Sequence, residues 1–181
     1  LQNADLNGDG RDEYIIFAKG STEKPLRMLV FSQEEDGTCI LLEDIAFRGY
    51  SFVQVEYVEI DETPGCEIVL GRQVSDQIMG TVNIYSFGNG SAQQLLSSTY
   101  TKFLTCDLDS NGHRELLVMR PGESDMDTGI AVLYSYKDGA VERSVEAAMS
   151  ARAEDIKRIT SSHLYGGDPA VYVSSAGRVD A

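Results

Sequence analysis

One short acidic segment carries residue types and a spacing that could bind a hard cation. It reads Asp5-Leu6-Asn7-Gly8-Asp9-Gly10-Arg11-Asp12-Glu13, with oxygen-bearing side chains at positions one, three, five and nine and glycine at position six. Calcium takes about six to eight oxygen ligands at roughly 2.3–2.6 Å, and alternate residues of a tight loop can turn inward to supply them. Gly10 permits the sharp reversal of the chain. The expected calcium ligands are the side chains of Asp5, Asn7, Asp9 and Glu13 and the carbonyl of Arg11.

A second segment repeats this spacing about a hundred residues later. It reads Asp107-Leu108-Asp109-Ser110-Asn111-Gly112-His113-Arg114-Glu115. Its expected calcium ligands are the side chains of Asp107, Asp109, Asn111 and Glu115 and the carbonyl of His113. The alternative for both segments is an acidic turn closed by side-chain hydrogen bonds without an ion.

The residues after each segment exclude an EF-hand. An EF-hand ends with a carboxylate at position twelve and continues into a helix. Position twelve of the first segment is Ile16, which lies in the β-forming run Tyr14-Ile15-Ile16-Phe17. A loop followed directly by a strand is therefore expected, with Glu13 or Glu115 at the end of the loop.

The acidic segments are part of a longer repeat. A weaker copy spans residues 59–67, where Thr63 and Pro64 replace the ligand at position five and the glycine at position six, so this copy is expected to close without metal. A fourth trace spans residues 161–168. Glu13, Glu67 and Glu115 are 54 and 48 residues apart, and the turn pairs Asp36-Gly37, Asn89-Gly90 and Asp138-Gly139 recur at a similar period.

Each period contains four β-like runs, which predicts an all-β fold of about three four-stranded antiparallel β-propeller blades plus part of a fourth. One repeat array is expected over residues 1–181, with approximate repeats at 1–49, 50–99, 100–150 and, as a partial repeat, 151–181. The expected strands are 13–18, 26–32, 38–47, 51–60, 67–71, 81–87, 92–99, 102–108, 115–119, 130–136, 140–147, 156–164 and 170–174. A helix within Val141–Arg158 remains an alternative, because that stretch is rich in alanine and charge.

The segments DLNGDGRDEYIIF and DLDSNGHRELLVM resemble the calcium loops of FG-GAP repeats, as in integrin α-subunit propellers, and of the related bacterial VCBS-type repeats. In that family the loop joins the first and second strands of a blade. The resemblance implies calcium as the cofactor and a fragment of a larger propeller, completed by further chain or by another subunit, because the family's propellers usually close with more blades.

Composition narrows the expected partners and location. The formal net charge of −14 over 181 residues argues against nucleic acid and anionic membranes as partners. No apolar run approaches the roughly 18 residues of a membrane span. Cys39, Cys66 and Cys106 are interpreted as core thiols, and one disulfide between two of them is the alternative. Because weak calcium sites are typical of extracellular proteins, an extracellular or cell-surface location is expected.

No catalytic motif is present in the sequence, which lacks H-E-x-x-H, G-x-S-x-G and P-loop patterns. No catalytic residue is therefore predicted. The leading hypothesis is a calcium-stabilised scaffold or binding module that presents loops to a protein or glycan partner. The alternatives are the non-catalytic part of a secreted polysaccharide-degrading enzyme and a structural spacer.

Overall fold

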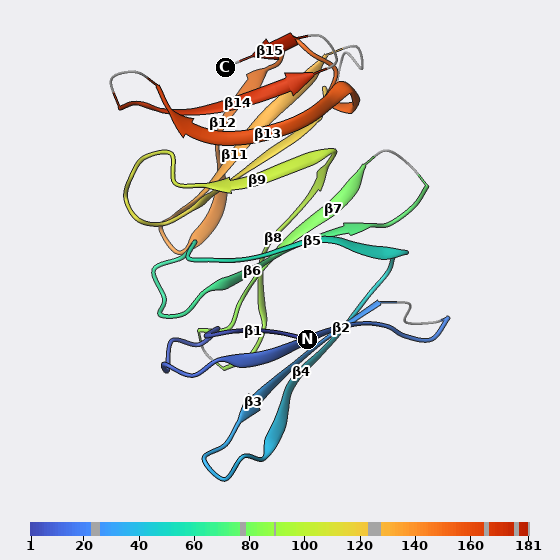
Figure 1. Cartoon of the computed structure of the whole chain (residues 1–181), viewed down its shortest axis with the longest axis vertical. Coiled ribbons are helices and arrows are strands. Elements are labelled where there is room, and N and C mark those ends of the chain that lie inside the picture. Colours follow the sequence, from blue (N-terminus) through green and yellow to red (C-terminus); the bar gives the residue numbers. More distant parts are fainter. Residues whose placement is uncertain are drawn as a thin grey trace. The chain divides into compact units, whose positions relative to one another are not determined.

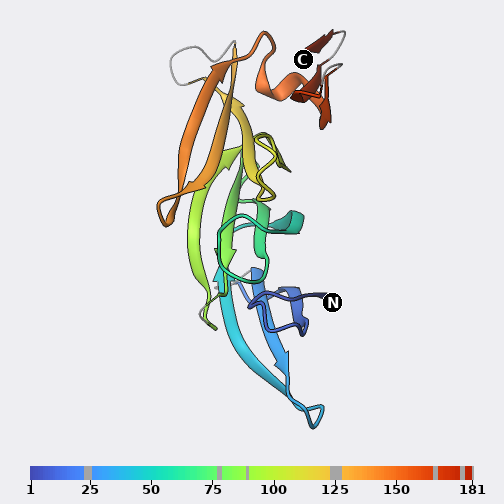
Figure 2. The ribbon, with the colours of Figure 1, turned by 90° about the vertical axis from the view of Figure 1, so that its left-hand side faces the viewer.

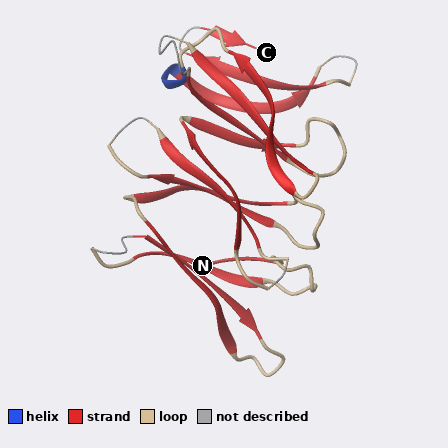
Figure 3. Cartoon of the chain, turned by 180° about the vertical axis from the view of Figure 1, so that it is seen from behind, coloured by secondary structure: helices blue, strands red, loops and turns tan. Residues whose placement is uncertain are grey.

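The computed structural model describes residues 1–22, 26–76, 79–88, 90–122, 128–164, 167–175 and 178–180. The chain is all-β, with three four-stranded antiparallel sheets and one three-stranded sheet (Figure 1). In each sheet the strands follow one another in chain order. Within the described residues the helical structure is a single 3-10 turn, Ala153–Asp155, which Figure 3 shows in blue. The expected fold class of blade-like antiparallel sheets is confirmed.

The chain divides into two compact units, Leu1–Ser98 and Thr99–Ala181. The first sheet contains β1 (Gln2–Ala4), β2 (Glu13–Lys19), β3 (Leu26–Gln33) and β4 (Cys39–Phe47). The second contains β5 (Ser51–Val58), β6 (Glu67–Gln73), β7 (Gly80–Ser86) and β8 (Gln93–Tyr100). The third contains β9 (Lys102–Cys106), β10 (Glu115–Pro121), β11 (Gly129–Lys137) and β12 (Ala140–Ala148). The fourth contains β13 (Ile156–His163), β14 (Pro169–Ser175) and β15 (Arg178–Asp180).

Every strand expected from the sequence is present, with its ends shifted by two residues or fewer. The open alternative at Val141–Arg158 is settled by β12, the 3-10 turn and the start of β13, so this stretch does not form an α-helix. Strands β1 and β15 were not expected, since three residues are too few to show a periodicity. The three cysteines are free thiols, but Cys39 is exposed, so the core interpretation is wrong for that residue.

The core of the first unit lies between its two sheets. Alternate residues of β3 are buried, including Met28 and Val30, because successive side chains of a strand point to opposite faces. They pack in one cluster with Ile15 of β2 and with Ile68 and Leu70 of β6. In the second unit, Leu117 and Met119 of β10 pack with Ala153, Ile156 and Val173.

Two hairpins in different units each contain a register shift, although residues 34–38 form the first turn and Asp138 and Gly139 alone form the second. The turn residues Gly37, Asp138 and Gly139 have φ of 84°, 51° and 90°, which fits turns that need a left-handed backbone. Asn89 of the third expected turn pair lies outside the described residues. In the β3–β4 pair the register shifts between Val30 and Phe31, and in the β11–β12 pair it shifts between Leu133 and Tyr134.

The shifts leave one extra residue in the outer strand of each hairpin, which is Leu42 in β4 and Ser144 in β12. Each of these residues lies six positions after the aspartate of its turn. Such β-bulges increase the local twist, and Figure 2 shows β3 and β4 bending together towards their connecting turn. The first and third sheets thus resemble each other even in the position of the β-bulge in their last strand.

The core packing predicts a large effect of truncating Met28, whose side chain has no exposed surface. We expect Met28→Ala to lower the free energy of unfolding by about 2–5 kcal/mol, because it removes buried methylenes and leaves a cavity. Urea denaturation followed by circular dichroism measures this change. Ile40→Ala in the adjacent β4 strand is the control, since Ile40 is 45% exposed and its truncation should cost within about 0.5 kcal/mol. Equal effects of the two substitutions would contradict the assigned core.

Candidate metal centre

Three loops connect the first and second strands of a sheet, and the sequence predicted both flanking strands for the second and third of these loops. The first loop is Asp5–Glu13 between β1 and β2, the second loop is Glu59–Glu67 between β5 and β6, and the third loop is Asp107–Glu115 between β9 and β10. The final glutamate of each loop is also the first residue of the following strand. A rigid strand therefore positions the carboxylate at position nine. Of the fourth trace, residues 165 and 166 lie outside the described residues.

In the first loop the acidic side chains turn inward and accept hydrogen bonds from the loop's own backbone. The Asp5 carboxylate accepts the N–H groups of Gly8 and Gly10 at 2.7 and 3.0 Å. The Asn7 side-chain oxygen accepts the Asp9 N–H at 2.9 Å. The Asp9 carboxylate in turn accepts the Arg11 N–H at 2.8 Å. Positions one, three and five thus direct their oxygens into one turn, as a cation-binding loop requires.

The third loop has a similar scheme, with one difference: its position-one aspartate accepts an N–H from position five, whereas Asp5 accepts one from position four. The Asp107 carboxylate accepts the N–H groups of Asn111 and Gly112, each at 3.1 Å. Asp109 accepts the Asn111 N–H at 3.1 Å, and the Asn111 side-chain oxygen accepts the His113 N–H at 2.7 Å. Gly10 and Gly112, at position six, both have a left-handed backbone with φ of 84° and 94°. The two loops therefore share the hydrogen bonds at positions three, five and six and the left-handed glycine, although they lie in different units.

The glutamate at position nine fastens each loop at its base. Its Oε2 accepts the backbone N–H of the residue at position two: Glu13 from Leu6 at 2.9 Å, Glu67 from Ile60 at 2.7 Å and Glu115 from Leu108 at 2.7 Å. Leu6 and Ile60 are almost completely buried, and Leu6 belongs to the core of the first unit. One carboxylate oxygen is thus used to close the loop, which leaves the other oxygen as the candidate cation ligand.

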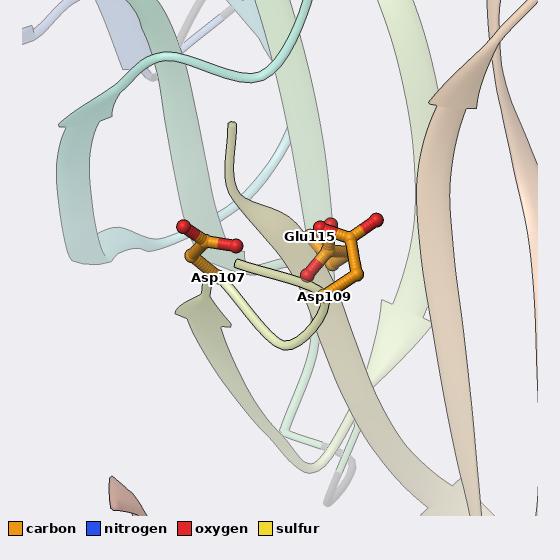
Figure 4. Close-up of side chains that lie close together, drawn as sticks. All are labelled: Asp107, Asp109 and Glu115. Atoms are coloured by element: carbon orange, nitrogen blue, oxygen red, sulfur yellow. The ribbon is translucent and has the colours of Figure 1, made fainter. Parts of the chain in front are cut away.

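The side chains converge most closely in the third loop. Carboxylate oxygens of Asp107, Asp109 and Glu115 lie within 4.8 Å of one another. Figure 4 shows the three side chains gathered at the loop between β9 and β10. Oxygens at this separation can share one divalent ion whose ligand distances are about 2.3–2.6 Å. In the described part of the first loop, no three carboxylates meet the same separation, and the Asn7 amide instead donates to Glu13 at 3.1 Å.

The electrostatics of both loops favour a cation. Burial raises the pKa of Glu13 above its ordinary value, and the charges of Asp9 and Asp5 raise it further, while the hydrogen bond from Leu6 lowers it. Glu115 has the same pattern: burial and the charges of Asp109 and Asp107 raise its pKa. A carboxylate whose charge is disfavoured by burial and by like charges is stabilised by a nearby positive ion. Each loop can therefore act as a cation ligand set.

The charged side chain at position seven of the first loop remains outside the ligand set. The Arg11 guanidinium is more than half exposed and pairs with the exposed Glu35 at 3.2 Å. An ion pair so exposed contributes little to stability, because water screens it. Arg11 therefore remains a predicted ligand through its backbone carbonyl only, and the His113 carbonyl is the corresponding predicted ligand of the third loop.

The second loop closes without an acidic ligand set. Asp61 is buried and accepts hydrogen bonds from the backbone N–H and the hydroxyl of Thr63, at 2.7 and 2.5 Å. Glu67 accepts the N–H groups of both Ile60 and Asp61. The Thr63 hydroxyl thus donates a hydrogen bond to the Asp61 carboxylate, at a place where a cation would stabilise a carboxylate in the other two loops. The predicted distinction between this loop and the other two rests on these contacts.

Comparison with known proteins leaves the chain unassigned: no family model matches it, and no curated protein has a significantly similar sequence. The described part of the chain contains no helix long and apolar enough to cross a membrane. The ten predicted ligand residues therefore rest on the geometry of the loops.

Sequence reasoning treated the glutamate at position nine only as a ligand and missed its bond to the backbone. A signal was present, because Glu67 stands at position nine even though the second loop lacks the ligand at position five and the glycine at position six. Sequence reasoning also missed that Cys66 donates a hydrogen bond to the Asp5 carbonyl and that Pro64 and Gly65 lie against the first loop. Residues so far apart in the chain carry no spacing pattern.

The fastening role of Glu115 predicts different effects of two substitutions. Glu115→Ala leaves the Leu108 N–H without its acceptor, and we expect a loss of about 1–3 kcal/mol in the free energy of unfolding. Glu115→Gln keeps an acceptor oxygen and should be markedly less destabilising. Both values are measured by urea denaturation in a chelating buffer, with Glu142→Ala on the exposed face of β12 as control. Equal losses for the alanine and glutamine variants would exclude the fastening role.

The buried Glu67 predicts a pH dependence of stability. Burial is the main cause that raises its pKa above 4.5, so the folded protein binds this proton more tightly than the unfolded chain does. The associated stability is fully present below pH 4.5 and is lost as the pH rises through the pKa of the folded state.

We expect Glu67→Gln, which carries no charge at any pH, to show a smaller decrease in melting temperature than the parent chain between about pH 4 and about pH 8. The exposed Glu62 of the same loop provides the control as Glu62→Gln. The role of Glu67 is ruled out if the parent and the Glu67→Gln variant have parallel pH profiles.

Proposed function

We propose that this chain is a calcium-stabilised β-propeller scaffold of the FG-GAP or VCBS type, without catalytic residues of its own. In this proposal, calcium binds the first loop through Asp5, Asn7, Asp9, Glu13 and the Arg11 carbonyl. It binds the third loop through the corresponding set, which is Asp107, Asp109, Asn111, Glu115 and the His113 carbonyl.

The observation that carries the proposal is the convergence of Asp107, Asp109 and Glu115 within 4.8 Å. The first loop adds a second case, because the oxygens at positions three and five accept the same backbone N–H groups there as in the third loop. Oxygen-only ligand sets favour hard cations, and calcium tolerates the irregular geometry of a loop better than magnesium does.

A structural role suits these loops better than a catalytic role. The ligands come from one short segment, and the glutamate at position nine also fastens that segment to a strand. A bound cation would therefore neutralise the acidic turn and hold the first and second strands of a sheet together. Ligands supplied almost entirely by the protein leave little room for a substrate.

The proposed setting is extracellular or on a cell surface, where calcium is abundant enough to fill weak sites. The proposed partner is a protein or a glycan that binds loops at the ends of the sheets. A net charge of −14 keeps such a scaffold soluble and disfavours binding to nucleic acid.

Calcium binding predicts a gain in stability on adding the ion. Extracellular modules bind calcium with dissociation constants of about 10⁻⁴–10⁻³ M, so about 10 mM calcium should add about 1.4–2.7 kcal/mol per site to the free energy of unfolding. We expect the melting temperature in calcium to exceed that in a chelator, and magnesium to have a smaller effect. Scanning calorimetry measures the shifts, and isothermal titration calorimetry measures the affinity and the number of sites.

A charge-matched pair of variants assigns the effect to the third loop. Asp109→Asn removes one converging carboxylate and should abolish the third-loop part of the calcium response. Asp138→Asn removes the same charge from an exposed hairpin turn in the same unit and should leave the response intact. A parent chain that melts at the same temperature in calcium and in chelator would refute the proposal.

A further inference from the structure

The second loop makes direct contact with the first loop inside the first unit. The backbone N–H of Cys66 donates to the carbonyl oxygen of Asp5 at 3.0 Å, and the Cys66 thiol lies 3.2 Å from the same oxygen. Asp5 occupies position one of the first loop, and its carboxylate organises the turn through Gly8 and Gly10. The residue on which the first loop depends most is therefore held from outside by the second loop.

The two loops also approach closely enough to exclude side chains. A Cβ atom on Gly65 would lie 2.5 Å from the carbonyl oxygen of Leu6 and 2.9 Å from the nitrogen of Asn7. A Cβ atom on Gly8 would lie 2.2 Å from the Cβ of Pro64 and 2.8 Å from the nitrogen of Gly65. Distances below 3 Å are severe clashes, so both positions need glycine as long as the loops remain in contact.

The third loop shows that backbone conformation alone does not demand glycine at position four. There, Ser110 occupies the place of Gly8, and the two residues have similar left-handed backbones with φ of 59° and 74°. A serine is thus compatible with this turn when no neighbouring loop presses on it. The close approach of Pro64 distinguishes the first loop.

The second loop is suited to hold a neighbour because it is already closed by its own hydrogen bonds. Thr63 satisfies Asp61, and Glu67 fastens Ile60 and Asp61, so its shape depends on no ion. A preformed element that fixes a ligand loop lowers the conformational cost of binding. Thr63, which replaces the position-five ligand, and Pro64, which replaces the position-six glycine, thereby serve a different role.

We propose that the second loop positions the first loop for cation binding. Pro64, Gly65 and Cys66 hold the backbone from Asp5 to Gly8, so that occupancy of the first loop and seating of the second loop are energetically coupled. This inference rests on the proposed function of the first loop as a calcium site. By linkage, calcium at the first loop also stabilises the contact between the two loops to the same extent.

The test uses the full chain with the third loop silenced by Asp107→Asn and Asp109→Asn, so that titration calorimetry with calcium reports the first loop. In this background, Gly8→Ser introduces the side chain that the third loop tolerates. We expect calcium affinity to fall by about 5- to 150-fold, the usual range for coupled sites. Adding Pro64→Gly to Gly8→Ser removes the nearest clashing atom and should restore part of the affinity.

Gly37→Ser is the matched control for backbone strain. Gly37 also has a left-handed backbone, with φ of 84°, but its hairpin turn leaves open space around the Cβ position. Gly37→Ser should leave calcium affinity unchanged even if it lowers the melting temperature. A purely structural role of Gly8 would change stability in both variants and affinity in neither, and that result would overturn the inference.

Two substitutions at Cys66 test the coupling without straining the backbone. Cys66→Ala removes the thiol beside the Asp5 carbonyl and should weaken calcium binding, whereas Cys66→Ser retains a donor and should preserve it. Equal affinities for the parent, alanine and serine chains, together with an unchanged Gly8→Ser affinity, would refute positioning by the second loop. If the chain with Asp107→Asn and Asp109→Asn alone binds no calcium, the proposed function of the first loop fails. This result is obtained before any Gly8, Pro64 or Cys66 variant is measured.

Discussion

The interaction on which the loops depend is a hydrogen bond from a backbone N–H to a buried glutamate. Glu13, Glu67 and Glu115 each accept the N–H of the residue seven positions earlier, at distances of 2.7–2.9 Å. A buried backbone donor without an acceptor is costly, and a buried carboxylate without partners is costlier. The two groups satisfy each other, which fixes where the loop ends and where the second strand of the sheet begins.

This fastening has an electrostatic consequence that the three loops resolve in two ways. The buried glutamate brings a negative charge to the base of a turn, and aspartates at positions one, three or five add more. In the first and third loops these charges raise the pKa of Glu13 and Glu115, so the apo loop is under electrostatic stress that a cation would relieve. In the second loop, burial and the charge of Asp61 also raise the pKa of Glu67, but there Asp61 accepts hydrogen bonds from the hydroxyl and the N–H of Thr63.

Much of the fold could be predicted because its signals are local. Alternating buried residues such as Met28 and Val30, breakers such as Gly37 and Gly139, and the recurrence of Glu13, Glu67 and Glu115 determine strands and turns within a few residues of themselves. Strand β1 could not be found in this way, because its three residues pair with β2 and show no pattern of their own. Cys39 was misjudged for a related reason: it lies at the first position of β4, where burial depends on the neighbouring strand.

The types of ligand in the candidate site could be predicted from the sequence, but the packing of other residues around the loops could not. Spacing identified Asp107, Asp109 and Glu115, which converge, yet the same spacing in the first loop gives a looser arrangement of the carboxylates. The two loops share most of their backbone hydrogen bonds, but in the first loop the Asn7 amide donates to Glu13, whereas in the third loop the Asn111 amide donates to Asp109. Around the first loop, Pro64 and Gly65 press against Gly8 and Leu6, and Cys66 holds Asp5, contacts between residues about sixty positions apart. Tertiary packing of this kind adjusts a ligand set that local sequence has already specified. In the proposed calcium site, a loop without the full ligand set would thus contribute to binding by shaping the neighbouring loop.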